Sequence, residues 1–215
     1  GVRLVGSEMC IRDRTEAVGL SGLFISDGPV VQVRDAYQRI RVHEDPDNAQ
    51  QYTGPLLVMI NRFSASASEI FAAAMQDYNR GIIIGQNTYG KGTVQQSRSL
   101  NFVYDLDQTP LGLLQYTIQK FYRINGGSTQ LKGVESDIVV PDKYKYIDIG
   151  ERDMPNAMPW DKIEPAKYTP WANNANFDMA IENSKKRISE NEYLKLIDEN
   201  AQWVKQQQKD NVFPL

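Results

Sequence analysis

Residues 55–85 read PLLVMINRFSASASEIFAAAMQDYNRGIIIG and say more about the fold than any other part of the chain. Two continuous apolar runs, residues 55–61 and 82–84, have the character of strands that are buried on both faces. Between them, apolar side chains recur at helical spacing (Ile70, Phe71, Ala74, Met75 and Tyr78). A strand, a helix and a strand within about 30 residues form a βαβ unit. The sequence therefore predicts an α/β fold.

The flanking segments carry weaker patterns. Residues 15–25 predict an amphipathic helix that ends at the turn formed by residues 26–29, and residues 30–33 predict a short strand. Residues 43–52 are polar and contain the only histidine, His43, so we expect a loop with His43 on the surface. From residue 177 onward the spacing of apolar residues predicts two amphipathic helices.

Composition excludes several classes of function. Hydrophobic residues make up 41% and charged residues 24% of the 215 residues, as in soluble globular proteins. The net charge of −3 gives no reason to expect nucleic acid as a partner. No apolar run approaches the length of about 20 residues that a membrane span requires, and none resembles a signal peptide. Without a His or Cys cluster, the sequence predicts neither a metal site nor a cofactor.

The first 14 residues differ from the rest of the chain. Residues 8–14 (EMCIRDR) resemble translated adapter sequence, and we interpret residues 1–14 as non-native sequence from which no fold is predicted. The only cysteine, Cys10, falls within this segment, so the remaining chain offers no disulfide. We interpret the chain as a fragment whose true N-terminus is missing.

Ser66 is the first candidate for catalysis, since the pattern places it at the start of the central helix. Free backbone N–H groups and the helix dipole at that position favour a developing oxyanion. A serine at a helix start is also a common cap, and Ser66 with Glu69 has the spacing of a capping box. Position alone therefore leaves both the nucleophile and the cap open.

Lys91 is the second candidate, because Gly90 and Gly92 flank it and allow close approach of the backbone. A lysine acts as a general base only when it is neutral, which burial favours. The alternative is a solvent-facing lysine in a turn. A Ser-His-Asp triad within this chain would have to recruit His43, so a lysine base is the simpler proposal.

Residues 55–96 resemble the catalytic core of the C-terminal processing peptidases, in particular the tail-specific proteases of bacterial envelopes, and the similarity continues through residues 115–138. The resemblance implies a crotonase-like or ClpP-like core of βαβ units. It divides the chain into a partial peptidase core (15–141), a linker (142–175) and the start of a helical C-terminal domain (176–215). Residues 158–161 (MPWD) also resemble a short motif of these proteases.

The resemblance assigns roles to individual residues. It implies that Ser66, rather than Ser64 or Ser68, is the nucleophile and that Lys91 is its general base. The backbone N–H of Ala67 is implied as half of the oxyanion hole. The second donor is expected in a glycine-rich turn just before residue 15, where this chain has the adapter-like residues.

Two further residues match positions linked to activity in the family. Gln95 corresponds to a glutamine that orients the lysine. Four residues along a strand span about 13 Å, so a contact between Gln95 and Lys91 requires a bend near Gly92. Asp77 lies about 16 Å along the helix from Ser66, so we expect it to act structurally, for example by bonding the next loop, and not as a triad member.

By resemblance, the function is that of a serine endopeptidase acting on proteins with apolar, unstructured C-termini. The family also implies an upstream PDZ domain, an adaptor protein as partner, and a periplasmic location with peripheral attachment to the inner membrane. Because the second oxyanion donor and the PDZ domain are not found in this sequence, we expect the chain by itself to be inactive.

Two other classes of protein remain as alternatives. A non-catalytic peptide-binding module could keep the same fold, but it would not need Ser66, Lys91 and Gln95 together. A crotonase-type acyl-CoA enzyme would use oxyanion donors and carboxylates on a thioester. Thioester turnover that survives Ser66→Ala would favour that class.

Overall fold

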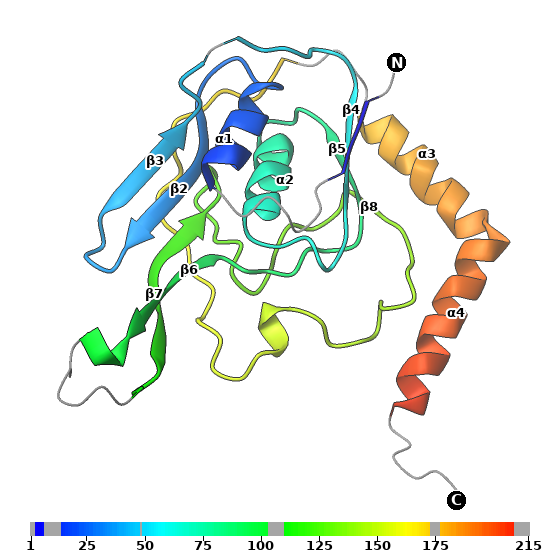
Figure 1. Ribbon diagram of the computed structural model, residues 1–215. Helices are drawn as coiled ribbons and strands as arrows, with labels where there is room; N and C mark the ends of the chain where they lie inside the picture. The colour runs from blue at the N-terminus through cyan, green and yellow to red at the C-terminus, as the bar shows by residue number, and fades with distance from the viewer. Residues whose placement is uncertain (1–2, 7–13, 48, 103–109, 173–176, 209–215) are drawn as a thin grey trace, which may run out of the picture.

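The computed structural model describes residues 3–6, 14–47, 49–102, 110–172 and 177–208, which form two sheets with helices between and beside them (Figure 1). The parallel sheet has the order β1 (Arg3–Gly6), β4 (Leu56–Ile60), β5 (Ile82–Gly85) and β8 (Ile138–Val139). The antiparallel sheet has the order β3 (Ile40–Glu44), β2 (Pro29–Asp35), β7 (Leu113–Tyr122) and β6 (Thr93–Ser99). Helices α1 (Arg14–Gly22) and α2 (Ala67–Asp77) lie between the two sheets.

The predicted βαβ unit is confirmed. Strands β4 and β5 pair in parallel, with Val58 opposite Ile83, and α2 connects them. The apolar stripe of α2 is buried and includes Phe71 and Met75, neither of which is exposed. The expectation that β4 is buried on both faces is wrong, because Met59 is 49% exposed. Only the alternate residues of β4 face the helices, so burial follows the two-residue period of a strand.

Three boundaries differ from the sequence-based expectations. Helix α1 ends at Gly22, and the apolar residues that follow it form a turn. The loop expected at residues 43–52 begins after Glu44, because His43 and Glu44 still belong to strand β3, and His43 is partly buried. Strand β1 falls within residues 1–14 and pairs with β4 through backbone bonds. Such edge pairing needs no hydrophobic period, which explains why the pattern did not reveal it. Cys10 lies outside the described residues.

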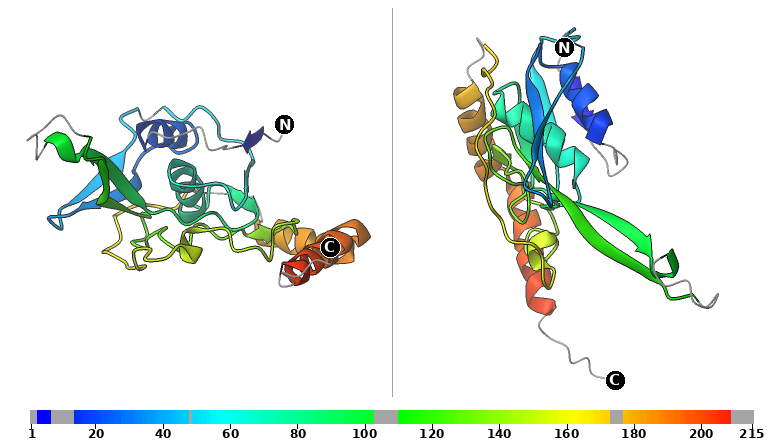
Figure 2. Two further views of the ribbon diagram at one scale, coloured as in Figure 1. Left: turned by 60° about the horizontal axis from the view of Figure 1, so that its bottom comes forward. Right: turned by 90° about the vertical axis from the view of Figure 1, so that its left-hand side faces the viewer.

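The C-terminal part begins with an irregular segment, residues 140–172, that contains the short helix η2 (Glu151–Asp153). The two expected helices are confirmed as α3 (Phe177–Glu190) and α4 (Glu192–Gln207), which run along one side of the molecule (Figure 2). Helix α3 packs beside β8, and Asp198 on α4 accepts from Lys145 Nζ at 2.6 Å. Among the described residues, no helix has the length and apolar character needed to cross a bilayer.

Candidate active site

Ser66 stands at the junction between the loop after β4 and the first turn of α2. Its backbone has φ 58° and ψ −115°, a combination that residues with a side chain rarely adopt. Strained backbone of this kind clusters at active sites, and a serine on a sharp strand-to-helix turn exposes its hydroxyl. Ser64 and Ser68 are 4% and 1% exposed, whereas Ser66 is only partly buried. The geometry thus presents Ser66 and hides its two serine neighbours.

The residue after Ser66 supplies a free donor. Ala67 is the first residue of α2, so its backbone N–H has no carbonyl one turn earlier in the helix to bond. The positive end of the helix dipole lies at the same place. An oxyanion formed on a carbonyl attacked by Ser66 would meet this N–H, as the resemblance implies.

Glu69 joins the two halves of the site. Its carboxylate is fully buried and accepts four hydrogen bonds, none of them from a cationic side chain. Oε2 accepts from the N–H of Ser66 at 2.7 Å and of Lys91 at 2.9 Å. Oε1 accepts from Thr88 Oγ1 at 2.5 Å and from the N–H of Gly90 at 2.7 Å. Two nitrogens that share one acceptor lie at most about 6 Å apart, so Glu69 brings the backbones of Ser66 and Lys91 together.

The environment of Glu69 also changes the pKa of its carboxyl. Burial raises the pKa of the Glu69 carboxyl to about 7, although the hydrogen bonds from the Thr88 hydroxyl and the three amides lower it. Sequence reasoning assigned Glu69 only a place in the capping box. That bond is present, and the same carboxylate also holds residues 88–91, which sequence spacing does not predict. A signal was available, since an acidic residue followed by Ile70 and Phe71 on a buried helix face needs buried donors.

Lys91 lies in the loop between β5 and β6, partly exposed, with a glycine on each side. Among the residues that the structure describes, no acidic side chain pairs with Lys91, and such a partner would favour its charged form. Glycine is required at Gly90 by the backbone conformation and at Gly92 by close packing. Gly90 has φ 89°, and a Cβ on Gly92 would lie 2.4 Å from the backbone N of Gln130.

The structure does not bring Gln95 to Lys91. Gln95 is exposed on β6, and its Oε1 accepts from Gln115 Nε2 on β7 at 2.7 Å. A register shift between Val94 and Gln95 bends the strand at that point. Within the described part of the chain, no hydrogen bond joins Gln95 to Lys91, so its orienting role stays a prediction.

Asp77 lies at the far end of α2 from Ser66. Its carboxylate is bound by Arg123 through Nη2 at 2.6 Å and Nε at 3.1 Å, and by Asn125 Nδ2 at 2.8 Å. Burial raises the pKa of Asp77, and the hydrogen bonds from Arg123 oppose that shift. These contacts tie the end of α2 to the end of β7 and to the loop that follows it.

A strained serine at a helix start with a free amide beside it is typical of a serine-type peptidase. Comparison with known families agrees. Residues 13–140 match Peptidase family S41, and residues 144–215 match the C-terminal domain of tail specific protease. The chain belongs to peptidase family S41, as the resemblance implied.

Two proteins with similar sequences are named as proteases. The chain is 72% identical over 167 residues to a protein of Haemophilus influenzae named "Tail-specific protease", a match that covers 78% of this chain and 24% of that protein. It is 35% identical over 146 residues to a "Carboxy-terminal-processing protease" of Bartonella bacilliformis, covering 65% of this chain and 32% of the relative. The chain thus spans about a quarter to a third of these relatives.

Solved structures support the fold. The photosystem II D1 C-terminal processing protease matches with a TM-score of 0.52 and 25% identity, over 64% of this chain and 33% of that one. A putative S41 protease from Bacteroides fragilis matches with a TM-score of 0.50 and 12% identity, over 68% of this chain and 40% of that one. The expected α/β core of this peptidase class is confirmed.

Proposed function

We propose that Ser66 is the nucleophile and Lys91 the general base of a serine endopeptidase. The observation that carries this proposal is the backbone of Ser66, which is held at φ 58° on the first turn of α2 by the bond from its N–H to Glu69. A serine that served only as a cap would need no such conformation, because cap residues adopt extended backbone.

The reaction follows from this arrangement. Neutral Lys91 Nζ takes the proton of Ser66 Oγ as Oγ attacks the peptide carbonyl, and the N–H of Ala67 stabilises the oxyanion. As the intermediate collapses, Lys91 gives the proton to the departing amine. Water then attacks the acyl-enzyme, again with Lys91 as base, and releases Ser66. Gln95 orients Lys91 in this proposal, which requires it to leave Gln115.

The substrates that we propose are proteins with apolar, unstructured C-terminal tails. The similarity to the H. influenzae "Tail-specific protease" supports this class of substrate. The same resemblance supports a periplasmic location, peripheral association with the inner membrane and an adaptor protein as partner. We propose this location and these partners for a full-length protein that contains such a core, and not for the present chain alone.

We further propose that the 215-residue chain alone cleaves substrate slowly or not at all. The family resemblance places the second oxyanion donor in a glycine-rich turn just before residue 15. Residues 8–14 (EMCIRDR) contain no glycine. Without that glycine-rich turn, we expect no backbone N–H from this position to be held towards the oxyanion, and the loss of one such donor lowers kcat by about 100- to 1,000-fold.

The test uses two preparations. One is the chain alone, and the other is a chimera in which residues 15–208 replace the aligned segment of the H. influenzae tail-specific protease. Each is incubated with a protein that ends in an apolar tail, and products are read by mass spectrometry. We expect cleavage by the chimera and its loss in Ser66→Ala and in Lys91→Ala. Cleavage that survives Lys91→Ala would identify another base, and a chimera that binds the tail without cleaving it would favour a peptide-binding module.

A further inference from the structure

The Lys91 loop, residues 88–92, is held from two sides. Glu69 accepts from the N–H groups of Gly90 and Lys91 on one side. On the other side, the Gly92 N–H donates to Gln130 Oε1 at 2.9 Å. The carbonyl of Gly90 accepts from the N–H of Leu131 at 2.9 Å. The backbone around Lys91 therefore has a second support that does not involve Glu69.

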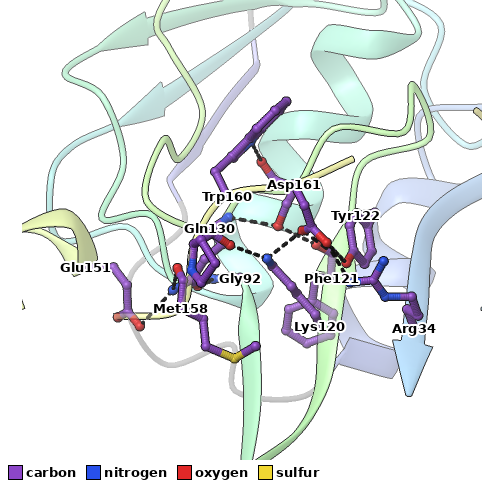
Figure 3. Close-up of polar contacts among 12 residues, drawn as sticks. Arg34, Gly92, Lys120, Phe121, Tyr122, Gln130, Glu151, Met158, Trp160 and Asp161 are labelled. Atoms are coloured by element: carbon purple, nitrogen blue, oxygen red, sulfur yellow. Dashed lines mark hydrogen bonds and ion pairs between the residues drawn. The ribbon is translucent and has the colours of Figure 1, made fainter. Parts of the chain in front are cut away.

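Gln130 is the centre of this second support (Figure 3). Its side chain is fully buried, and every polar atom of its amide has a partner. While Oε1 accepts from Gly92, Nε2 donates to Glu151 Oε1 and to the carbonyl of Met158, both at 3.2 Å. A buried amide with all its bonds satisfied has one orientation, so whatever fixes Glu151 and Met158 also fixes the acceptor that faces Gly92.

Met158 begins a short segment, Met158–Asp161, which we call the strap. Its side chains and carbonyls are bound to the antiparallel sheet. Lys120 Nζ on β7 donates to the Pro159 carbonyl and to Asp161 Oδ1, both at 2.5 Å. Trp160 Nε1 donates to the Ser128 carbonyl at 2.8 Å. The strap thus lies across β7 and the turn that leads to Gln130.

Asp161 is the main anchor of the strap. Besides Lys120, Arg34 Nη2 on β2 binds its Oδ2 at 2.5 Å, and the Tyr122 hydroxyl donates to it at 3.0 Å. Burial alone would raise the pKa of Asp161, but the hydrogen bonds from Lys120, Arg34 and Tyr122 outweigh it and hold the pKa below its usual range. Lys120 is 4% exposed, and loss of its partner would leave a buried charge unpaired.

We propose that Gln130 is a positioning residue for Lys91 and that the strap Met158–Asp161 keeps it in place. The strap lies in the region that matches the C-terminal domain of tail specific protease, outside the segment that matches Peptidase family S41. A part of the chain beyond the peptidase core therefore supports the catalytic loop. The inference rests on the proposed role of Lys91 as base, because Gln130 acts on the reaction only through that loop.

The first test measures amide hydrogen exchange on the full 215-residue chain. Gln130→Met removes the acceptor of the Gly92 N–H and keeps the shape of the side chain. We expect exchange at Gly92 to rise by at least about tenfold, while the Gly90 and Lys91 amides stay protected by Glu69. Unchanged exchange at Gly92 would overturn the proposal.

A matched control is Gln32→Met. Gln32 is 3% exposed, and its Nε2 also donates to two main-chain carbonyls, those of Arg123 and Glu164, at 3.2 Å each. This variant loses the same kind of buried amide, away from the Lys91 loop. Faster exchange at Gly92 in Gln32→Met as well would indicate general loosening and contradict a specific role for Gln130.

The second test measures turnover in the chimera. A misplaced base lowers kcat more than it changes substrate binding, so we expect Gln130→Met to lower kcat by about 10- to 100-fold with little change in KM. Unchanged kcat, or a loss no larger than in Gln32→Met, would overturn the proposal. A chimera without activity would refute the proposed function, and the exchange experiment would then still decide whether Gln130 holds the loop.

A double variant distinguishes loss of the coupling between Gln130 and Glu151 from simple misfolding. Gln130→Glu keeps an acceptor for Gly92 but sets a second carboxylate against Glu151, so kcat should fall. Adding Glu151→Gln returns a donor and an acceptor to that pair and should recover part of the loss. A double variant that is no better than Gln130→Glu alone would contradict the coupling between Gln130 and Glu151.

Discussion

The backbone amides of Ser66 and Lys91 donate to the same oxygen, Glu69 Oε2, at 2.7 and 2.9 Å. One buried carboxylate thus holds the backbones of the proposed nucleophile and base, and in the described part of the chain no hydrogen bond joins Ser66 directly to Lys91. An ionised carboxylate can accept from all four of its donors, whereas a protonated one must itself donate a hydrogen. The arrangement of the site therefore depends on the charge of Glu69.

Glu69 should make stability depend on pH. Burial raises its pKa from 4.5 to about 7 in the folded chain. The folded state then binds the proton more tightly than the unfolded state, so the contribution of Glu69 to stability is complete below pH 4.5 and is lost as the pH rises through about 7. The loss should amount to about 3 kcal/mol at most.

Urea unfolding of the parent and of Glu69→Gln between pH 4.5 and pH 8 tests this, starting at the ordinary pKa of the carboxyl. Relative to the variant, the parent should lose free energy of unfolding as the pH rises. Identical pH dependence in the two proteins would show that the Glu69 carboxyl is not shifted by burial.

Gly92 should not tolerate a side chain. A Cβ at this position would meet the backbone N of Gln130 at 2.4 Å and its Cα at 2.9 Å, and main-chain atoms cannot move aside cheaply. We expect Gly92→Ala to lower the free energy of unfolding by about 2 kcal/mol or more. In Gly19→Ala, the added methyl meets nothing within 4 Å in helix α1, and the helix should gain up to about 1 kcal/mol. Equal effects in the two variants, measured by urea unfolding, would argue against the close packing at Gly92.

Asp77 should matter for stability through Arg123. The side chains of Asp77 and Arg123 are 4% and 16% exposed, so Asp77→Ala leaves a largely buried guanidinium without its carboxylate partner, while Gln76 Oε1 still accepts from it at 2.9 Å. We expect the free energy of unfolding to fall by about 3 kcal/mol. The control is Arg39→Ala, which breaks an ion pair whose arginine is 62% exposed and should change stability far less. An Asp77 variant as stable as the parent that had still lost catalysis would point to a direct role in the reaction.

Much of the core could be predicted from sequence, because residues 55–85 carry clear strand and helix periods. Of the antiparallel sheet, strand β2 was predicted, at residues 30–33, but β6 and β7 could not be, since they have mostly exposed or half-buried residues and little alternation. Met59 shows a further limit. A continuous apolar run does not reveal which face of a strand the helices cover.

The site was only partly accessible to sequence reasoning. Ser66 and Lys91 could be named as candidates, and the family resemblance gave them their proposed roles and added Ala67. The burial of Glu69 could be inferred from its place beside Ile70 and Phe71, but neither Glu69 nor Gln130 could be assigned to the Lys91 loop, because each bonds to the backbone of that loop over a long sequence separation. Such bonds depend on the tertiary fold and leave no periodic pattern in the sequence.

The most direct test of the Ser66–Lys91 mechanism is the reaction of Ser66 with a fluorophosphonate, which modifies an activated serine hydroxyl far faster than an ordinary one. The chimera would be labelled and digested, and the modified residue identified by mass spectrometry beside Ser64→Ala and Lys91→Ala. We expect modification at Ser66, unchanged in Ser64→Ala and slowed by at least about 1,000-fold in Lys91→Ala. Modification at another serine, or at Ser66 with an undiminished rate in Lys91→Ala, would contradict the Ser66–Lys91 mechanism.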